Sequence, residues 1–300
     1  MNPMNDTKKA FANSEYATVR EVLLCVPALH MPTPGKQVFA APQLASQQHR
    51  YLVQALTDEG VVCRFIESDP QLPYQCYTRD SCVITPWGLL VTRMGFTPRK
   101  AEQDAMLRYA KASETPIWQQ VSVGSLEGGD VMLIRPGLVL IGVNGVRTTR
   151  AAAEQVAHWF EAEGWSARIV EYPTTFRHLD ILVGVVGSHD LLCATDALHP
   201  ADLAWLRVQG YHLHTVPLDE CRTMACNTLN LGDGRVVTHA RNAFVNQYLS
   251  GLGVRTVPVD ISEYADDDGG VHCLVQALVR DAATTLNRAD LLPLAGAFHV

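Results

Sequence analysis

The chain of 300 residues lacks the features that define several large classes of protein. Arg, Asp or Gly interrupts every apolar run before it reaches the ~20 residues that a membrane-spanning helix needs. No apolar segment of signal-peptide length follows the polar stretch 1–16, so we expect a soluble, cytoplasmic protein with no membrane partner. The basic residues are scattered and the net charge is −7, which argues against nucleic acid as a partner.

Metal-binding motifs and domain boundaries are missing as well. None of the eight cysteines belongs to a CxxC pair or to a His/Cys pattern typical of zinc, so we predict no metal site. We expect reduced thiols, most of them small, buried, apolar side chains. No linker or low-complexity segment divides the chain, which predicts one domain over residues 1–300, with a flexible N-terminal segment at 1–16.

What the sequence does contain is a polar landmark that recurs five times, at steps of 47, 51, 48 and 47 residues. Each landmark precedes an apolar run rich in β-branched residues, which is typical of a strand. The landmarks are Asp80, Glu127, His178, Cys226-Asn227 and Cys273, and the runs that follow them are 83–85, 131–134, 181–186, 228–231 and 274–278.

A second set of strands and a set of helices repeat with the same period. Short turns containing Gly, Pro or Asp join four of the landmark strands to the next apolar run, which predicts hairpins. Helical patterns follow, and four of them end at a glycine before an alternating segment. The second strands are predicted at 22–26, 89–92, 138–142, 191–194 and 236–240, and the helices at 42–58, 100–112, 149–163, 200–208 and 243–252.

The predicted unit is therefore strand, turn, strand, helix and strand, repeated about five times with a period of about 45–50 residues. We predict an α/β fold in which five units close into a pseudo-symmetric propeller, with the landmarks around a central cavity. A doubly wound α/β sheet also alternates strands and helices. The repeated hairpins, and the lack of a Gly-rich loop after the first strand, favour the ring.

Residues with defined chemistry would meet in that cavity. Cys273 offers a nucleophilic thiol and His178 an imidazole for proton transfer. Asp80, Glu127 and Asp180 add negative charge, which suits a planar cation such as guanidinium. Because alternate residues of a strand share a face, His178 and Asp180 are both predicted to point into the cavity.

In this order and spacing, ending in Asp-Gly-Gly-Val-His-Cys, the motifs resemble those of the guanidine-modifying (pentein) superfamily. That superfamily includes arginine deiminases, agmatine deiminases, dimethylarginine hydrolases and amidinotransferases, and the resemblance extends from about residue 22 to residue 280. It implies that Cys273 attacks the guanidinium carbon. It also implies that His178 protonates the departing amine and then activates water, with no cofactor.

The same resemblance assigns substrate contacts. Asp80 and Asp180 would hold the guanidinium nitrogens, and Glu127 would support His178 or the substrate. Arg99 and Arg147 match arginines that hold the carboxylate of the substrate in the family. The implied partner is a small guanidino compound, while the oligomeric state, a homo-oligomer included, stays open.

Departures from the family bear on the substrate. His272 stands where arginine deiminases usually carry an arginine, and the chain has no room for their helical insertion. The His272-Cys273 pair resembles agmatine deiminases, which lack the carboxylate-binding arginines. Asp180 favours unsubstituted terminal nitrogens. We therefore expect hydrolysis of arginine to a ureido product and ammonia, with dimethylarginine hydrolysis, ornithine-forming dihydrolysis, amidinotransfer and, less favoured, a non-catalytic binding scaffold as alternatives.

Structural roles compete with these assignments. Asp80 could form a surface ion pair with the preceding arginine, and His178 could be a core histidine. Arg99 and Arg147 lie at predicted helix starts, where solvent could surround them. We also expect that Asp130 braces the Gly-Gly turn, that Asn227 binds backbone groups, and that 263–268 is an exposed loop, with a role as a lid left open.

Overall fold

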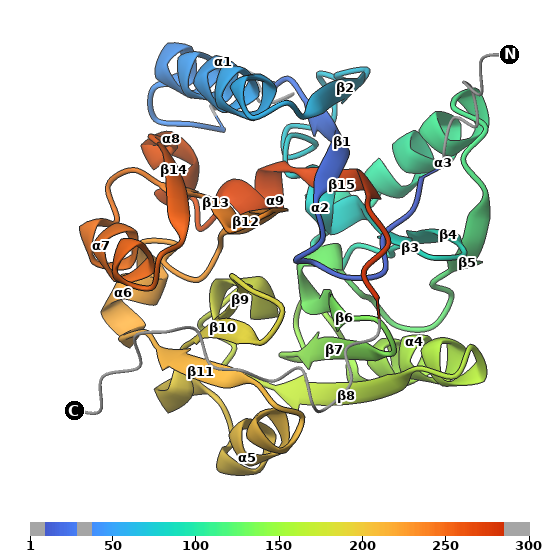
Figure 1. Ribbon diagram of the computed structural model, residues 1–300. Helices are drawn as coiled ribbons and strands as arrows, with labels where there is room; N and C mark the ends of the chain where they lie inside the picture. Colours follow the sequence, from blue (N-terminus) through green and yellow to red (C-terminus); the bar gives the residue numbers. More distant parts are fainter. Residues whose placement is uncertain (1–9, 29–37, 285–300) are drawn as a thin grey trace, which may run out of the picture.

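Five small sheets of three strands each make up the framework of the computed structural model, which describes residues 10–28 and 38–284 (Figure 1). In the order of hydrogen bonding they are β15 (Gln276–Arg280), β1 (Val19–Cys25) and β2 (Val62–Ile66); β3 (Cys82–Thr85), β4 (Gly88–Val91) and β5 (Ile117–Gln120); β6 (Val131–Arg135), β7 (Leu138–Val143) and β8 (Ser166–Glu171); β9 (Val183–Val185), β10 (Asp190–Cys193) and β11 (His212–Thr215); and β12 (Leu229–Gly232), β13 (Arg235–His239) and β14 (Arg255–Val259).

All five sheets share one topology. The middle strand pairs antiparallel with the first strand and parallel with the third. A parallel pair needs a crossover connection, and a helix supplies it in every unit. These helices are α1 (Pro42–Asp58), α3 (Glu102–Ala112), α4 (Arg150–Ala162), α5 (Pro200–Val208) and α7 (Ala243–Gly251), and Figure 1 shows them on the outside of the sheets.

Differences in burial explain why the strands differ in their hydrophobic pattern. Every residue of β3, β4 and β7 is buried, and these strands are continuous apolar runs, as expected for strands covered on both faces. The third strand of a unit is partly exposed, and β5 has no fully buried residue. Apolar side chains of neighbouring units pack together between the sheets, for example Val83 and Leu90 against Val139 and Phe160.

Most predicted elements are confirmed because their signals are local. The predicted helices 42–58 and 200–208 coincide with α1 and α5, and the four predicted hairpins are present. Thr149 caps α4 by accepting a hydrogen bond from the backbone N–H of Ala152. Gly164 then takes φ +80°, the left-handed conformation that favours glycine after a helix.

Two predicted strands begin instead as helical turns. The run 181–186 starts in η3 (Leu179–Ile181) before β9, and the run 274–278 starts in α9 (Val271–Leu274) before β15. Corresponding turns, α2 (Thr78–Ser81) and η2 (Gly128–Asp130), precede β3 and β6. The remaining short helices are η1 (Thr97–Arg99), η4 (Thr195–Ala197), α6 (Leu218–Arg222) and α8 (Ser262–Ala265).

The first unit joins the two ends of the described chain, which the sequence did not reveal. Strand β1 pairs with β15, with Val22 opposite Ala277. Residues 10–16 also pack here, because Phe11 exchanges backbone hydrogen bonds of 2.8 Å with Leu278 and Arg280. Residues 10–16 thus contact β15, residues 1–9 lie outside the described part of the chain, and the flexibility expected for 1–16 stays a prediction.

Contacts link each unit to the next around the molecule. They join β15 to β3, α2 to η2, η2 to η3, β9 to β12 and β12 to β1. The turns α2 and α9 lie toward the middle of Figure 1. The α/β class and the five repeated units are thus confirmed. Among the described helices, none combines the length and the apolar character that crossing a membrane requires.

Candidate functional site

The landmark side chains come together in the interior. Asp80 lies in α2, Cys273 lies in α9, and Glu127 and His178 directly precede η2 and η3. All four are buried, with exposed fractions of 3 % or less, and Asp80, His178 and Cys273 line one cavity. Asp80 is therefore not part of a surface ion pair. Each landmark lies where a short turn leads into the first strand of its sheet, which is why equal spacing in sequence becomes convergence in space.

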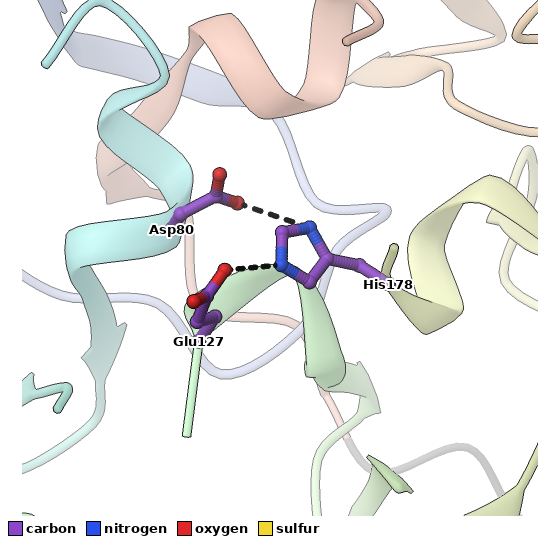
Figure 2. A group of neighbouring side chains, drawn as sticks. All are labelled: Asp80, Glu127 and His178. Carbon is purple, nitrogen blue, oxygen red and sulfur yellow. Dashed lines mark hydrogen bonds and ion pairs between the residues drawn. The ribbon is translucent and has the colours of Figure 1, made fainter. Parts of the chain in front are cut away.

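His178 is held between two carboxylates (Figure 2). Its Nε2 lies 2.7 Å from Oε2 of Glu127, and its Nδ1 lies 3.5 Å from Oδ1 of Asp80. The ring also lies on the backbone of Gly129, where a Cβ atom would come within 2.8 Å of it. The Gly-Gly sequence is thus needed so that the imidazole can approach the chain closely.

The carboxylate of Glu127 is fixed from both ends. Its Oε1 accepts hydrogen bonds from the backbone N–H groups of Gly95 and Phe96. Burial raises the pKa of Glu127, but the hydrogen bond and charge of His178, together with nearby arginines, outweigh burial and lower this pKa to about 2. Burial likewise lowers the pKa of His178, but Asp80, Cys273 and Glu127 raise it well above its ordinary value. The resting site therefore holds an imidazolium, which is the acid form needed to protonate a leaving group.

Asp130 supports this arrangement without facing the cavity. Its carboxylate accepts hydrogen bonds from Thr148 Oγ1, from the Tyr172 hydroxyl and from the backbone N–H of Leu179. The last of these bonds fixes the residue that follows His178. These contacts hold the backbone that follows His178, and none of them is to Gly128 or Gly129, so the expected bracing of the Gly-Gly turn by the Asp130 carboxylate stays a prediction.

Cys273 is surrounded by polar groups from other units. The Nδ2 group of Asn227 donates to its Sγ atom at 3.1 Å, and Oδ1 of Asn227 accepts from the backbone N–H groups of His272 and Cys273. Asn227 thus binds backbone groups, as predicted, and in addition reaches the sulfur. Oδ2 of Asp180 lies 3.7 Å from the same sulfur.

The surroundings of Cys273 favour the thiol over the thiolate. Burial and then the charge of Asp180 raise the pKa of Cys273 to about 12, although the hydrogen bond with His178 acts in the opposite direction. A thiolate next to carboxylates is disfavoured until a cation reaches the cavity. A cation bound beside Asp180 would therefore favour ionisation of the Cys273 thiol.

This inference predicts a pH dependence for labelling Cys273 with the neutral reagent 2-chloroacetamide. Below a pKa of about 12 the thiol dominates, so the rate should rise about tenfold per pH unit between pH 7 and pH 9.5. Peptide mass spectrometry, which separates Cys273 from the other cysteines, measures the rate. The half-buried Cys63 provides an internal comparison. A rate for Cys273 that levels off near pH 7 would contradict the assigned resting state.

Two carboxylate oxygens near Cys273 have no hydrogen-bond partner among the described residues. They are Oδ1 of Asp180 and Oδ1 of Asp80, both inaccessible to solvent; Oδ1 of Asp80 has only the 3.5 Å ion-pair contact with Nδ1 of His178. Buried polar atoms are nearly always paired in native proteins, so unpaired acceptors of this kind point to a missing donor. A ligand with several N–H groups would supply it.

His178 and Asp180 do not share a strand face, so that part of the prediction is wrong. His178 has extended backbone angles, but Asp180 lies inside the 3₁₀ turn η3. The turn sends the two side chains to different partners: His178 meets Glu127, and Asp180 meets His272, 2.8 Å from its Nδ1. Both remain near Cys273, since Oδ2 of Asp180 lies 3.7 Å from its sulfur and His178 lines the same cavity.

Arg99 does not present a free guanidinium to a substrate. It is buried, and its donors go to Asp80 at 2.5 Å, to both oxygens of Glu102, and to the backbone oxygens of Tyr74 and Tyr77. The expected contact with a substrate carboxylate would require Arg99 to leave these acceptors. The observed contacts instead orient Asp80.

Arg147 and Arg177 are the more accessible cations of the cavity lining. Arg147 donates one hydrogen bond of 3.3 Å to Glu127 and lies 4.6 Å above the ring of Phe96, and its other donors have no protein acceptor in the described segments. Arg177, which sequence reasoning missed, forms ion pairs with Asp267 and Asp268. The acidic run thus borders the mouth of the cavity, and only its position before Cys273 hinted at this.

Asp80, Glu127 and His178 could also be read as metal ligands. Each offers one atom, and these atoms lie within 4.8 Å of one another. However, Arg99 and Arg147 already bind the two carboxylates, and these cations oppose a divalent ion at the same place. The contacts favour a hydrogen-bonded group, and the absence of a metal requirement stays a prediction.

Comparison with known proteins gives the chain a family context. The sequence profile described as "Arginine deiminase" matches residues 36–209 and 203–280. The chain is 28% identical over 283 residues to uncharacterized protein YkgA of Bacillus subtilis, covering 91% of this chain and 96% of that protein. It is 24% identical over 231 residues to the N(G),N(G)-dimethylarginine dimethylaminohydrolase of Pseudomonas aeruginosa, covering 77% and 87%. It is 26% identical over 265 residues to the arginine deiminase of Listeria welshimeri, covering 71% of this chain and 63% of that protein.

Solved structures share the fold at lower sequence identity. A dimethylarginine dimethylaminohydrolase mutant from Pseudomonas aeruginosa, complexed with citrulline, gives a TM-score of 0.72 at 22% identity and covers 86% of this chain and 99% of that one. The N-terminal domain of ArgZ, a cyanobacterial arginine dihydrolase bound to its substrate, gives 0.76 at 16% identity, with 87% and 98% covered. These likenesses confirm the fold.

Proposed function

Because the chain belongs to the arginine deiminase family, we propose that it is a hydrolase acting on the guanidinium group of free arginine or a close relative. The profile match and the relatives support action on a guanidino C–N bond. Membership of the family does not distinguish arginine from a methylated arginine as the substrate, or one hydrolysis step from two. Our proposal of arginine and a single step rests on the residues of the cavity. We also propose that the five units form the propeller of the pentein fold.

The proposal rests on Oδ1 of Asp180, which has no hydrogen-bond partner among the described residues, and on Oδ1 of Asp80, which has only a 3.5 Å ion pair with Nδ1 of His178. A guanidinium group is planar, cationic and rich in N–H donors, so it complements two carboxylates whose free oxygens lie near one thiol. Its charge also offsets the repulsion that raises the pKa of Cys273. A single bound guanidinium group would thus donate hydrogen bonds to both carboxylates and favour the thiolate form of Cys273.

The proposed reaction has two stages. Binding of the cation favours loss of the Cys273 thiol proton to solvent, and the sulfur of the thiolate then forms a bond to the guanidinium carbon. His178 gives its proton to the departing nitrogen as the C–N bond breaks, releasing ammonia and leaving an amidino thioether. His178 then accepts a proton from water, which attacks the same carbon. The C–S bond then breaks, the protonated ureido product gives its proton to the sulfur, and the neutral product leaves with the Cys273 thiol and the His178 imidazolium restored.

The cations at the mouth favour an amino acid substrate. We propose that Arg147 binds the substrate carboxylate with its unused donors, with Arg177 beside it, and that Arg99 positions Asp80. The carboxylates of Asp267 and Asp268 would then face the substrate ammonium group. This arrangement matches the carboxylate and the ammonium group of an α-amino acid. Agmatine has no carboxylate for Arg147 to bind.

A substrate panel tests the proposal. Purified full-length protein is incubated with arginine, mono- and dimethylarginine, agmatine and short guanidino acids, and ammonia, methylamines, citrulline and ornithine are measured. We expect ammonia and citrulline in equal amounts from arginine. Dimethylamine release would assign dimethylarginine hydrolysis, and two ammonia molecules per ornithine would assign dihydrolysis. Release of none of these products would refute the hydrolase.

Replacement of Arg147 tests whether this residue binds the carboxylate of the substrate. Arg147→Gln should raise KM for arginine about 10- to 100-fold, because a hydrogen bond to a charged group contributes about 1.5–3 kcal/mol. Turnover of agmatine at high concentration should change far less, since agmatine has no carboxylate. Arg150→Gln, which removes an exposed arginine one turn further along the chain, is the matched control. An equal loss with both substrates would assign Arg147 to the support of Glu127.

A further inference from the structure

The segment 10–16 places a carboxylate in the interior behind the site. Backbone hydrogen bonds from Phe11 fasten this segment to β15, the strand that follows the helix of Cys273. Glu15 is buried there. Burial raises its pKa, but the charge of Arg79 and the charge and hydrogen bond of His272 outweigh burial and lower this pKa to about 2. Glu15 is therefore ionised at neutral pH.

The two oxygens of Glu15 bind two different residues. Oε1 accepts from Nη2 of Arg79 at 2.7 Å, and Oε2 lies 3.3 Å from Nε2 of His272. Arg79 directly precedes Asp80, and His272 directly precedes Cys273. One carboxylate thus joins the neighbours of a guanidinium-binding residue and of the nucleophile, although it touches neither of these two.

His272 extends this connection to Asp180. Its Nδ1 lies 2.8 Å from Oδ2 of Asp180, so the ring is placed between two carboxylates. An imidazole donates from both nitrogens only when it is charged. Burial lowers the pKa of His272, but Glu15 and then Asp180 raise it above the ordinary value, which favours that charged form. His272 then holds Oδ2 of Asp180 and leaves Oδ1 for a ligand.

We propose that Glu15 is a positioning residue for the guanidinium site: it holds His272 against Asp180, and it anchors the side chain of Arg79, whose backbone leads directly into Asp80. This inference rests on the proposed function, because it concerns the orientation of the carboxylates that would bind the substrate. A role of this kind predicts loss of cation recognition without loss of the thiol's intrinsic reactivity.

Two alkylating reagents separate these effects. In 2-chloroacetamidine and in 2-chloroacetamide the sulfur of Cys273 displaces chloride, and the thiol proton is released. Only the amidine is a cation with N–H donors like those of guanidinium. Glu15→Gln should slow labelling by the amidine about 100-fold, the cost of a misplaced contact, and leave labelling by the amide within about threefold. kcat/KM for the best panel substrate should fall in parallel with the amidine rate.

Glu59→Gln is the matched control. Glu59 likewise pairs with two basic side chains, Arg235 and Arg255, and none of these three residues lines the cavity of Asp80, His178 and Cys273. This variant should keep both labelling rates. Glu15→Asp, which retains the charge, should recover part of the amidine preference.

His272 supplies a second and independent variant. If Glu15 acts through His272, His272→Asn should lose the same preference for the amidine, and the double variant should lose little more than either single one. This variant also keeps the inference testable if Glu15→Gln does not fold. If the losses of amidine preference in Glu15→Gln and His272→Asn were additive in the double variant, the inference that Glu15 acts through His272 would be wrong.

The outcomes distinguish this inference from the proposed function. Wild-type protein that does not prefer the amidine, and that turns over no guanidino compound, contradicts the function itself. A wild type with both properties, together with Glu15→Gln that keeps the amidine preference, overturns only the role of Glu15. Equal slowing of both reagents in Glu15→Gln would show a general structural effect and would also overturn it.

Discussion

Cys273→Ala is expected to lower turnover of the guanidino substrate by on the order of a million-fold, as removal of a catalytic nucleophile does in other enzymes. Alanine removes the sulfur that forms the covalent bond but leaves the carboxylates that bind the cation. The variant should therefore still bind arginine by calorimetry. Steady-state release of ammonia, with acid quenching and mass spectrometry to trap the adduct on Cys273, measures the effect.

A matched control shows that the loss is chemical. Cys193→Ala removes another fully buried thiol, in β10, and should retain activity. If Cys273→Ala kept more than a few per cent of the activity, or if wild-type protein formed the adduct on another cysteine, the proposed nucleophile would be wrong.

His178→Asn is expected to lower kcat for arginine about 1000-fold, because His178 supplies a proton in the first stage and accepts one in the second. The effect should differ between substrates. S-methyl-L-thiocitrulline releases methanethiol, which leaves without the help of a strong acid, so the variant should form its adduct. That adduct should persist, since no base activates water.

His239→Asn is the control for this experiment, because His239 is a buried histidine that binds backbone groups of residues 259 and 261. It should retain turnover. Rapid-quench measurement of adduct formation and decay in both variants separates the two stages. Rapid decay of the adduct in His178→Asn would assign the activation of water to another group.

Local chemistry made much of the fold predictable. Gly164 ends α4, Thr149 begins it, and short turns join the paired strands. These signals depend on backbone angles and neighbouring side chains, so they can be read from a few consecutive residues. The repeat could also be read from the sequence, because its landmarks recur at steps of 47 to 51 residues. Three of these landmarks, Asp80, His178 and Cys273, do line one cavity, as the spacing predicted.

Distant contacts were not predictable in this way. Strand β1 finds its partner β15 at the other end of the described chain, and nothing near Val22 indicates this. Arg99 appeared to be a substrate ligand because of its motif, but the buried carboxylates of Asp80 and Glu102 bind it. Arg177 and Glu15 acquire their roles only from partners that are 64 or more residues away in sequence.

The sequence by itself determined the repeating α/β unit, the residue types of the site and their order along the chain, because turn and strand preferences act over short distances. Only the tertiary structure decided how each polar group is used. Asp180 lies in a helical turn and not in a strand, Arg99 donates its hydrogen bonds to acceptors of the protein, and Glu15 is buried next to His272. The physical reason is that a buried charge takes whichever partner the packed chain brings within reach: Arg99 found its carboxylates within its own unit, whereas Glu15 and Asp180 both met His272 from another part of the chain.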